Sequence, residues 1–258
     1  MKQPKPRMAI LDIETSHDIL ASFGLKEQYH SPENILADWY IICARWKWHG
    51  GSKIYGSCVL DDMKRFKKDC ADDYVVVKDM YDLFSDVDVV IGHNVKTFDW
   101  RKFYARLMYY RMKPLPAPIF IDTLKESRKL IAPSSHSLKH LSRYYNLTPK
   151  MEPSRGMGLK ILKGDIAATK ECYKYCGGDI TTTEEFFDLI APHLINSPLN
   201  HNLWRADGID CCVNCGGEHL TASTGARTTR TGRYRRWQCQ DCGKYMQAKK
   251  AFKTTNLR

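Results

Sequence analysis

Two acidic residues at the end of an apolar run are the first residues in this sequence whose spacing suits chemistry. Residues 8–14 read Met-Ala-Ile-Leu-Asp-Ile-Glu, and this apolar run predicts a strand buried on both faces. Side chains two apart on a strand point to one face, about 7 Å apart at their Cα atoms. Asp12 and Glu14 would repel each other there, and a hard cation such as Mg²⁺ or Mn²⁺ would relieve the repulsion. The alternative is a strand that runs out into a polar loop.

Two further acids follow elements that could carry them to the same place. Residues 88–92, Asp-Val-Val-Ile-Gly, predict a buried strand, and from Thr97 the pattern turns helical, which puts Asp99 in the first helical turn. Tyr175 and Asp179 are four apart, so a helix places them on one face. The alternatives are a first-turn acid favoured by the helix dipole at position 99, and a packed tyrosine at position 175 with its hydroxyl on a backbone group.

The last quarter of the chain carries a second set of metal-ligand spacings. Of the ten cysteines, four form two C-x-x-C pairs with 23 residues between them: Cys212, Cys215, Cys239 and Cys242. In a reducing compartment such clustering indicates a metal rather than disulfides, and four thiolates suit one tetrahedral Zn²⁺. The spacing resembles that of a zinc ribbon over residues 208–248, with Cys211 as a spare thiol. A register shifted by one residue is the alternative. Since some 50 residues cannot easily build a core, we expect zinc to be needed for folding.

The charge of the chain is unevenly distributed. The net charge is +11, and residues 200–258 alone hold 11 Lys/Arg against 4 Asp/Glu. A basic C-terminal part favours a polyanionic partner, most simply nucleic acid. Between the cysteine pairs, arginines could reach phosphates while Tyr234 or Trp237 stacks on bases; these arginines include Arg233, Arg235 and Arg236. The alternatives are a tryptophan that forms the small core of the ribbon and arginines on a solvated face.

The elements that must position these residues can be read from the patterns. Residues 39–49 and 53–60 predict a hairpin that turns at Gly50-Gly51, so three antiparallel strands open the sheet. The remaining expectations are loop with a short helix at 15–38, helices at 78–85, from 97, at 122–130 and at 137–146, a strand at 119–122, and a loop at 150–163. Asp165 can cap a helix that runs to about Gly178, and an apolar stripe continues to Leu194.

Three motifs in order resemble the DEDD superfamily of 3′-to-5′ exonucleases. They are Asp12-Ile-Glu-Thr15, Asn94 to Asp99 as N-x-x-x-F-D, and Tyr175 to Asp179 as Y-x-x-x-D. The histidine branch would have His at position 174, where Lys174 stands, so the resemblance is to the tyrosine branch. Residues 121–124 and 137–139 also resemble stretches between the second and third motifs. The resemblance covers about residues 7–195 and looks closest to bacterial and phage members related to the proofreading domains of family-B DNA polymerases.

The resemblance implies an α/β, ribonuclease-H-like fold with a mixed five-stranded sheet flanked by helices. It also implies two Mg²⁺ or Mn²⁺ ions held by Asp12, Glu14, Asp99 and Asp179, and a water oriented or deprotonated by Tyr175. The residues expected to contact nucleic acid are Thr15, Asn94, Phe98 and Lys139. For Phe98, packing in the core is the alternative.

We therefore expect a ribonuclease-H-like exonuclease domain at residues 1–198 and a zinc ribbon with a basic tail at 199–258, joined by a linker at 196–198. The expected function is two-metal 3′-to-5′ exonuclease activity, with DNA favoured over RNA as the substrate and replication or repair proteins as further partners. The alternatives are a non-catalytic nucleic-acid-binding adaptor, or a transposase-like endonuclease, against which the D-x-E on the first strand argues. No apolar run suits a membrane span or a signal segment, so we expect a cytoplasmic location. The resemblance implies that this is the cytoplasm of a bacterium or of a phage-infected host.

Overall fold

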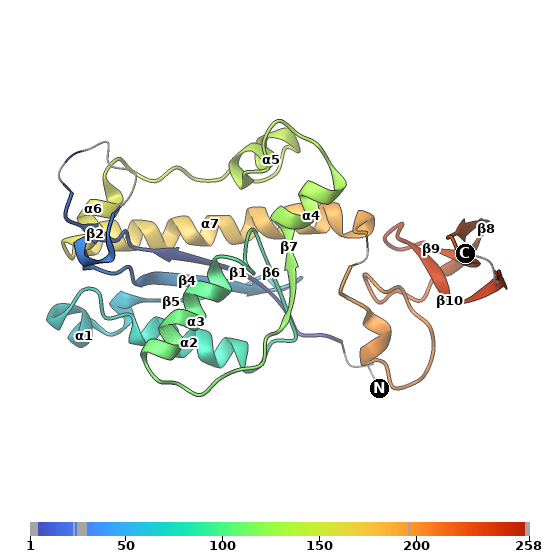
Figure 1. Ribbon diagram of the computed structural model, residues 1–258, viewed down its shortest axis with the longest axis horizontal. Coiled ribbons are helices and arrows are strands. Elements are labelled where there is room, and N and C mark those ends of the chain that lie inside the picture. The colour runs from blue at the N-terminus through green and yellow to red at the C-terminus, as the bar shows by residue number, and fades with distance from the viewer. Residues whose placement is uncertain (1–4, 23, 25–29, 196, 256–258) are drawn as a thin grey trace.

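A five-stranded mixed sheet forms the centre of the molecule in the computed structural model, which describes residues 5–22, 24, 30–195 and 197–255 (Figure 1). The strand order is β5-β4-β1-β6-β7. The strands are β1 (Met8–Thr15), β4 (Ile41–Trp48), β5 (Ile54–Cys58), β6 (Val89–Gly92) and β7 (Ile119–Asp122). The first three in chain order pair antiparallel, while β6 is parallel to both β1 and β7. The α/β class and the mixed five-stranded sheet predicted from the sequence are confirmed.

Helices cover both faces of this sheet. The long α7 (Ile166–Ile190) runs along one face, and α2 (Tyr74–Phe84) and α3 (Asp99–Tyr109) lie on the other (Figure 1). The shorter helices are α1 (Met63–Lys68), α4 (Thr123–Leu130), α5 (Leu138–Tyr144) and α6 (Met157–Leu162). Neighbouring residues of β1 enter different cores, because Leu11 packs with α2 and α3 whereas Ile10 packs with α7. This alternation confirms a first strand that is buried on both faces.

Strand β4 divides its side chains between the two faces in the same way. Lys47 forms an ion pair with Glu184 of α7, and His49 Nε2 lies 2.7 Å from Asp188 Oδ1 on the same helix. Trp46 and Trp48 alternate with these residues and therefore face the α2 side. The polar side chains of β4 thus anchor α7, and its indoles lie under α2.

Helix α7 continues without a break through Gly177 and Gly178. A Cβ at position 177 would lie 3.4 Å from the guanidinium of Arg45, and one at position 178 would lie 3.4 Å from the sulfur of Met151. The two glycines therefore let α7 approach β4 and the segment after α5 closely, which offsets the helix propensity that they lack.

The segments expected to be loops contain more regular structure than their composition indicates. Residues 157–162 form α6, because Ile161 is buried against the core under α7. In the polar stretch at 15–38, β2 (Ile19–Leu20) pairs with β3 (Ile35–Ala37) after a 3₁₀ turn, η1, at Pro32–Asn34, so the described part contains a small sheet. Helix α2 begins four residues earlier than predicted.

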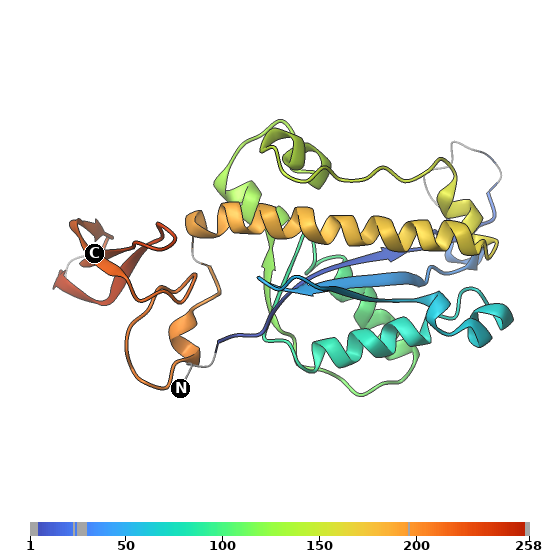
Figure 2. The same ribbon diagram turned by 180° about the vertical axis from the view of Figure 1, so that it is seen from behind.

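The C-terminal module, residues 208–254, is a three-stranded antiparallel sheet in the order β10-β9-β8. Its strands are β8 (Leu220–Thr228), β9 (Gly232–Cys239) and β10 (Tyr245–Thr254). The module lies beyond the C-terminal end of α7 in both views (Figures 1 and 2). Leu199 and Trp204 pack in the core under α7, the latter from the 3₁₀ turn η4 (His201–Trp204), and Lys244 donates to the backbone oxygen of Leu194. Asn196 of the predicted linker lies outside the described residues, and the two-domain division at residue 198 stays a prediction. No helix in the described part of the chain is long and apolar enough to cross a bilayer.

Candidate functional site

Three carboxylates from distant parts of the sequence meet where β1 passes under α7. Asp12 and Glu14 of β1 and Asp179 of α7, here called the acid cluster, each offer an oxygen, and these atoms lie within 4.8 Å of one another. Asp12 and Glu14 point to the α7 face because Leu11 and Ile13 fill the opposite one. Carboxylate oxygens are the ligands that Mg²⁺ and Mn²⁺ prefer, and three of them lie close enough here to bind one ion.

Asp99, the first residue of α3, lies behind the acid cluster rather than within it. Its side chain is only 3% exposed, and its Oδ1 accepts a hydrogen bond of 3.0 Å from the backbone N–H of Ile13. Ile13 stands between Asp12 and Glu14 on β1, so the carboxylate of Asp99 is fixed against the same stretch of strand. The structure thus brings all four acids of the predicted ligand set to one region.

The electrostatics of this region favour a positive ion. Burial raises the pKa of Asp99 to about 8 and that of Glu14 to about 7. Burial, together with the carboxylates of Asp99, Glu14 and Asp179, raises the pKa of Asp12 well above its ordinary value. Each shift records the cost of holding a negative charge near other negative charges away from water.

Two carboxylate oxygens nearby are buried without a hydrogen bond in the described structure: Oδ1 of Asp179 and Oδ2 of Asp122. Buried oxygens are normally satisfied, and a coordinated cation is one way to satisfy them. Asp122 caps α4, and its Oδ1 accepts from the backbone N–H of Asn94 at 3.1 Å. The donor set present therefore fits divalent metal ions.

Lys150 is one of two residues at this site that the sequence did not reveal. Its Nζ lies 2.6 Å from Asp179 Oδ2 and 5.0 Å from the centre of the Tyr175 ring. Although burial alone would lower it, the hydrogen bonds to Asp179 and Tyr175 raise the pKa of Lys150. The sequence shows only a basic segment with little local signal, and the fold places this lysine beside the acid cluster.

Tyr175 lies one turn before Asp179 on α7. Burial raises the pKa of Tyr175 above its ordinary value, so its hydroxyl is neutral at pH 7. The next residue, Cys176, was also missed: its thiol donates to Asp12 Oδ2 at 3.3 Å. A neutral phenol and a thiol donor thus flank the carboxylates on the same helix.

The residues expected to contact nucleic acid occupy different positions. Thr15 ends β1 at a register shift after Glu14. Asn94 has a positive φ of 74° and its Oδ1 accepts a hydrogen bond from Thr97. Phe98 is 37% exposed beside Asp99, which makes the core-packing alternative wrong. Lys139 lies on α5 and pairs with Glu152 at 2.5 Å on the surface.

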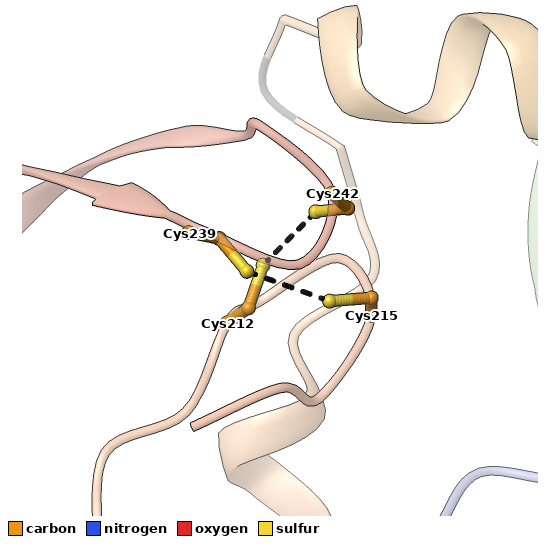
Figure 3. Close-up of side chains that lie close together, drawn as sticks. All are labelled: Cys212, Cys215, Cys239 and Cys242. Carbon is orange, nitrogen blue, oxygen red and sulfur yellow. Dashed lines mark hydrogen bonds between the residues drawn. The ribbon is translucent and has the colours of Figure 1, made fainter. Parts of the chain in front are cut away.

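The four cysteines of the C-x-x-C pairs converge in the C-terminal module (Figure 3). Their sulfur atoms lie within 4.8 Å of one another, with Cys212 Sγ at 3.6 Å from Cys242 Sγ and Cys215 Sγ at 3.7 Å from Cys239 Sγ. Cys211 is buried outside this group, and its backbone is held by Asn202. The register shifted by one residue is therefore wrong, and the four sulfur donors can hold one zinc ion.

The three arginines expected to bind phosphates lie along β9. Arg233 and Arg235 are exposed, and Arg236 is half-buried with its guanidinium 4.8 Å from the Tyr245 ring. Trp237 is half-buried and lines a cavity of about 550 Å³ together with Arg235. The indole therefore contributes to packing while it also borders a space next to an arginine.

Comparison with known proteins adds one finding about the fold. No protein-family model matches the sequence, and no curated protein matches it. The structure is similar to part of a DNA-synthesising enzyme, with a TM-score of 0.52 and 15% sequence identity. That enzyme is the family B DNA polymerase from the hyperthermophilic archaeon Pyrobaculum calidifontis. The match covers 73% of this chain and 25% of the polymerase, so the chain corresponds to about a quarter of it and the likeness is one of fold.

Proposed function

We propose that this protein is a metal-dependent 3′-to-5′ exonuclease, with DNA favoured over RNA as its substrate. The observation that carries the proposal is the meeting of Asp12, Glu14 and Asp179 within 4.8 Å, with Asp99 fixed behind them. The likeness of the fold to part of a DNA polymerase supports a nucleic-acid substrate.

The four acids would hold two Mg²⁺ or Mn²⁺ ions. Such ions, when bound, lower the pKa of a water molecule and stabilise the oxygen that leaves the phosphorus. The chain supplies the frame, because the apolar packing of β1, α3 and α7 brings the carboxylates together.

The other residues of the site would position the substrate and the attacking water. Tyr175, neutral at pH 7, orients the water by hydrogen bonding and does not act as its base. The ammonium of Lys150 can contact the scissile phosphate, since its present partner Asp179 is a metal ligand in this proposal. The exposed ring of Phe98 and the amide of Asn94 are placed to contact the terminal nucleotide.

The C-terminal module would hold the nucleic acid strand. One structural zinc ion bound by Cys212, Cys215, Cys239 and Cys242 would tie the segment before β8 to the turn between β9 and β10. Arg233, Arg235 and Arg236 on β9 would bind phosphates without regard to sequence.

The test is digestion of matched DNA and RNA oligonucleotides, single- and double-stranded and labelled at one end, with Mg²⁺ or Mn²⁺. We expect stepwise shortening from the 3′ end and loss of activity in Asp12→Ala with binding retained. The control Asp82→Ala, which removes an exposed acid of α2 on the far face of the sheet, should keep full activity. Binding without degradation in the wild type would support the adaptor instead. An endonuclease would be supported if the protein nicked circular single strands and left the 3′ ends of linear strands intact.

A further inference from the structure

A groove lies on the face of the sheet opposite the acid cluster, between the β5 edge and α2. Its volume is about 400 Å³. Its lining residues are Trp46, Trp48, Tyr55, Gly56, Asp79, Asp82, Leu83 and Asp86. Since Lys47 of β4 and His49, the residue that follows the strand, point to α7, the two indoles of β4 must face this side. The groove is thus separated from the acid cluster by the thickness of the sheet.

The floor of the groove is aromatic. The rings of Trp46 and Tyr55 are stacked at 6.4 Å with 14° between their planes, and Tyr55 is 37% exposed. Two cations of the protein already use these rings: Arg7 Cζ lies 4.6 Å from the Trp48 ring centre and Lys53 Nζ lies 4.7 Å from that of Tyr55. The faces of such rings attract guanidinium and ammonium groups.

The wall of the groove is acidic. Asp79, Asp82 and Asp86 follow one another at spacings of three and four residues along α2 and its C-terminal end, so they share one face. Asp82 and Asp86 pair with Lys78 and Arg7 at the surface. The side chain of Asp79 makes no hydrogen bond or ion pair with any residue that the structure describes. Asp79 therefore presents the carboxylate of this wall that no lysine or arginine of the described structure neutralises, and it attracts a cationic side chain and repels a phosphate.

The groove also borders an open sheet edge. Strand β5 is terminal in the sheet, and its ladder partner among the described residues is β4 alone. A strand edge presents backbone N–H and C=O groups to which an extended segment of another protein can add. Backbone pairing at β5 would carry alternate side chains of such a segment toward the aromatic floor.

We propose that this groove binds an extended, arginine- or lysine-rich segment of a partner protein. One cationic side chain lies over the stacked rings of Trp46 and Tyr55 and pairs with Asp79, while the backbone of the segment pairs with β5. Because the site lies on the far face of the sheet, the partner can bind while the acid cluster is occupied. The proposal is independent of the exonuclease activity.

The test uses a short labelled peptide that alternates arginine and serine, with a glutamate-serine peptide as its control, in fluorescence anisotropy with the full-length protein. We expect the arginine peptide alone to bind, with affinity falling as salt rises. Asp79→Asn with Asp82→Asn should weaken binding at least tenfold. The matched variant Glu33→Gln with Asp38→Asn, which removes two exposed acids elsewhere, should leave it unchanged.

A second variant, Tyr55→Ala, separates stacking from general charge attraction. It leaves every carboxylate in place, and we expect it to weaken binding of the arginine peptide at least fivefold while the nuclease assays match the wild type. Equal binding in the wild type and in both groove variants would overturn the proposal. Loss of oligonucleotide binding when the groove carboxylates are replaced would also overturn it. The same holds if the chain associates with itself at this face and binds no peptide.

Discussion

The acid cluster and the cysteine cluster gather their ligands in opposite ways. The carboxylates stand on β1 and α7, whose apolar residues fill two cores, so the frame exists before a metal binds. The cysteines stand at turns of a module whose strands β8 and β10 contain no buried residue. With metal bound as proposed, an ion would compensate charge at the first site and would supply the missing core at the second.

We expect the largest effect when a ligand of the cysteine cluster is removed. We expect Cys239→Ser to abolish stoichiometric zinc binding and to unfold β8–β10, because structural zinc contributes roughly 10 kcal/mol or more to such modules. Zinc content and amide NMR spectra would measure both. The matched control Cys211→Ser, at a buried thiol outside the cluster, should keep the zinc. A folded module without zinc would contradict the contrast.

The next effect is at the first site and is catalytic rather than structural. Asp12→Asn should lower the exonuclease rate by about 10³-fold, because the metal ions proposed to act on the scissile phosphate would lose one carboxylate ligand. The same change should keep or raise the melting temperature of the metal-free protein, since the buried charge is unfavourable. Asp82→Asn, at an exposed acid of α2 on the far face of the sheet, is the control. A rate within a factor of a few of wild type would remove Asp12 from the mechanism.

The acid cluster should also give the metal-free protein a distinctive pH dependence. The pKa of Glu14 is raised to about 7 and that of Asp99 to about 8 in the folded state, above the unfolded values of about 4. The folded state therefore binds more protons, so the contribution of these two acids to stability is fully present below about pH 4 and is lost as pH rises through 7 to 8. Thermal melts across this range should show the fall, and saturating Mg²⁺ should reverse it at the alkaline end. A melting temperature that rises with pH in metal-free protein would show that these acids are not confined together.

A smaller effect is expected at Lys150, which links the acid cluster to the segment before α6. Lys150→Met should lower the exonuclease rate about tenfold through loss of one charged hydrogen bond, while tightening Mg²⁺ binding because Asp179 loses a competing partner. Metal titration and turnover would be measured together. Lys170→Met, at an exposed lysine of α7, should change neither. Weaker Mg²⁺ binding in Lys150→Met would mean that the lysine supports the metal site rather than competing with it.

The smallest effect is expected on the surface of the C-terminal module. Arg233→Ala and Arg235→Ala should each weaken oligonucleotide binding a few-fold. Each should also reduce, by about 1, the slope of the logarithm of the binding constant against the logarithm of the salt concentration. Binding isotherms of the Asp12→Ala protein at several salt concentrations would give both quantities. An unchanged slope would mean that these arginines form a solvated face and that the module does not hold the strand.

Much of the frame could be predicted from the sequence because its signals are local. The strands at 8–14, 88–92 and 119–122 follow from short apolar runs, and the hairpin follows from Gly50-Gly51 between two such runs. The loop predicted at 150–163 was wrong where α6 forms, since the helix depends on burial of Ile161 against the core and not on its own composition.

The sequence by itself determined which ligands are available, because the D-x-E of β1 and the two C-x-x-C pairs are close in the chain and their spacing is local chemistry. Only the tertiary structure decided that Asp99 lies behind the carboxylates, that Lys150 reaches Asp179, and that Trp46 and Asp79 border one groove. The physical reason is that these contacts depend on how β1, β4 and the helices pack, and packing joins residues that share no pattern along the chain.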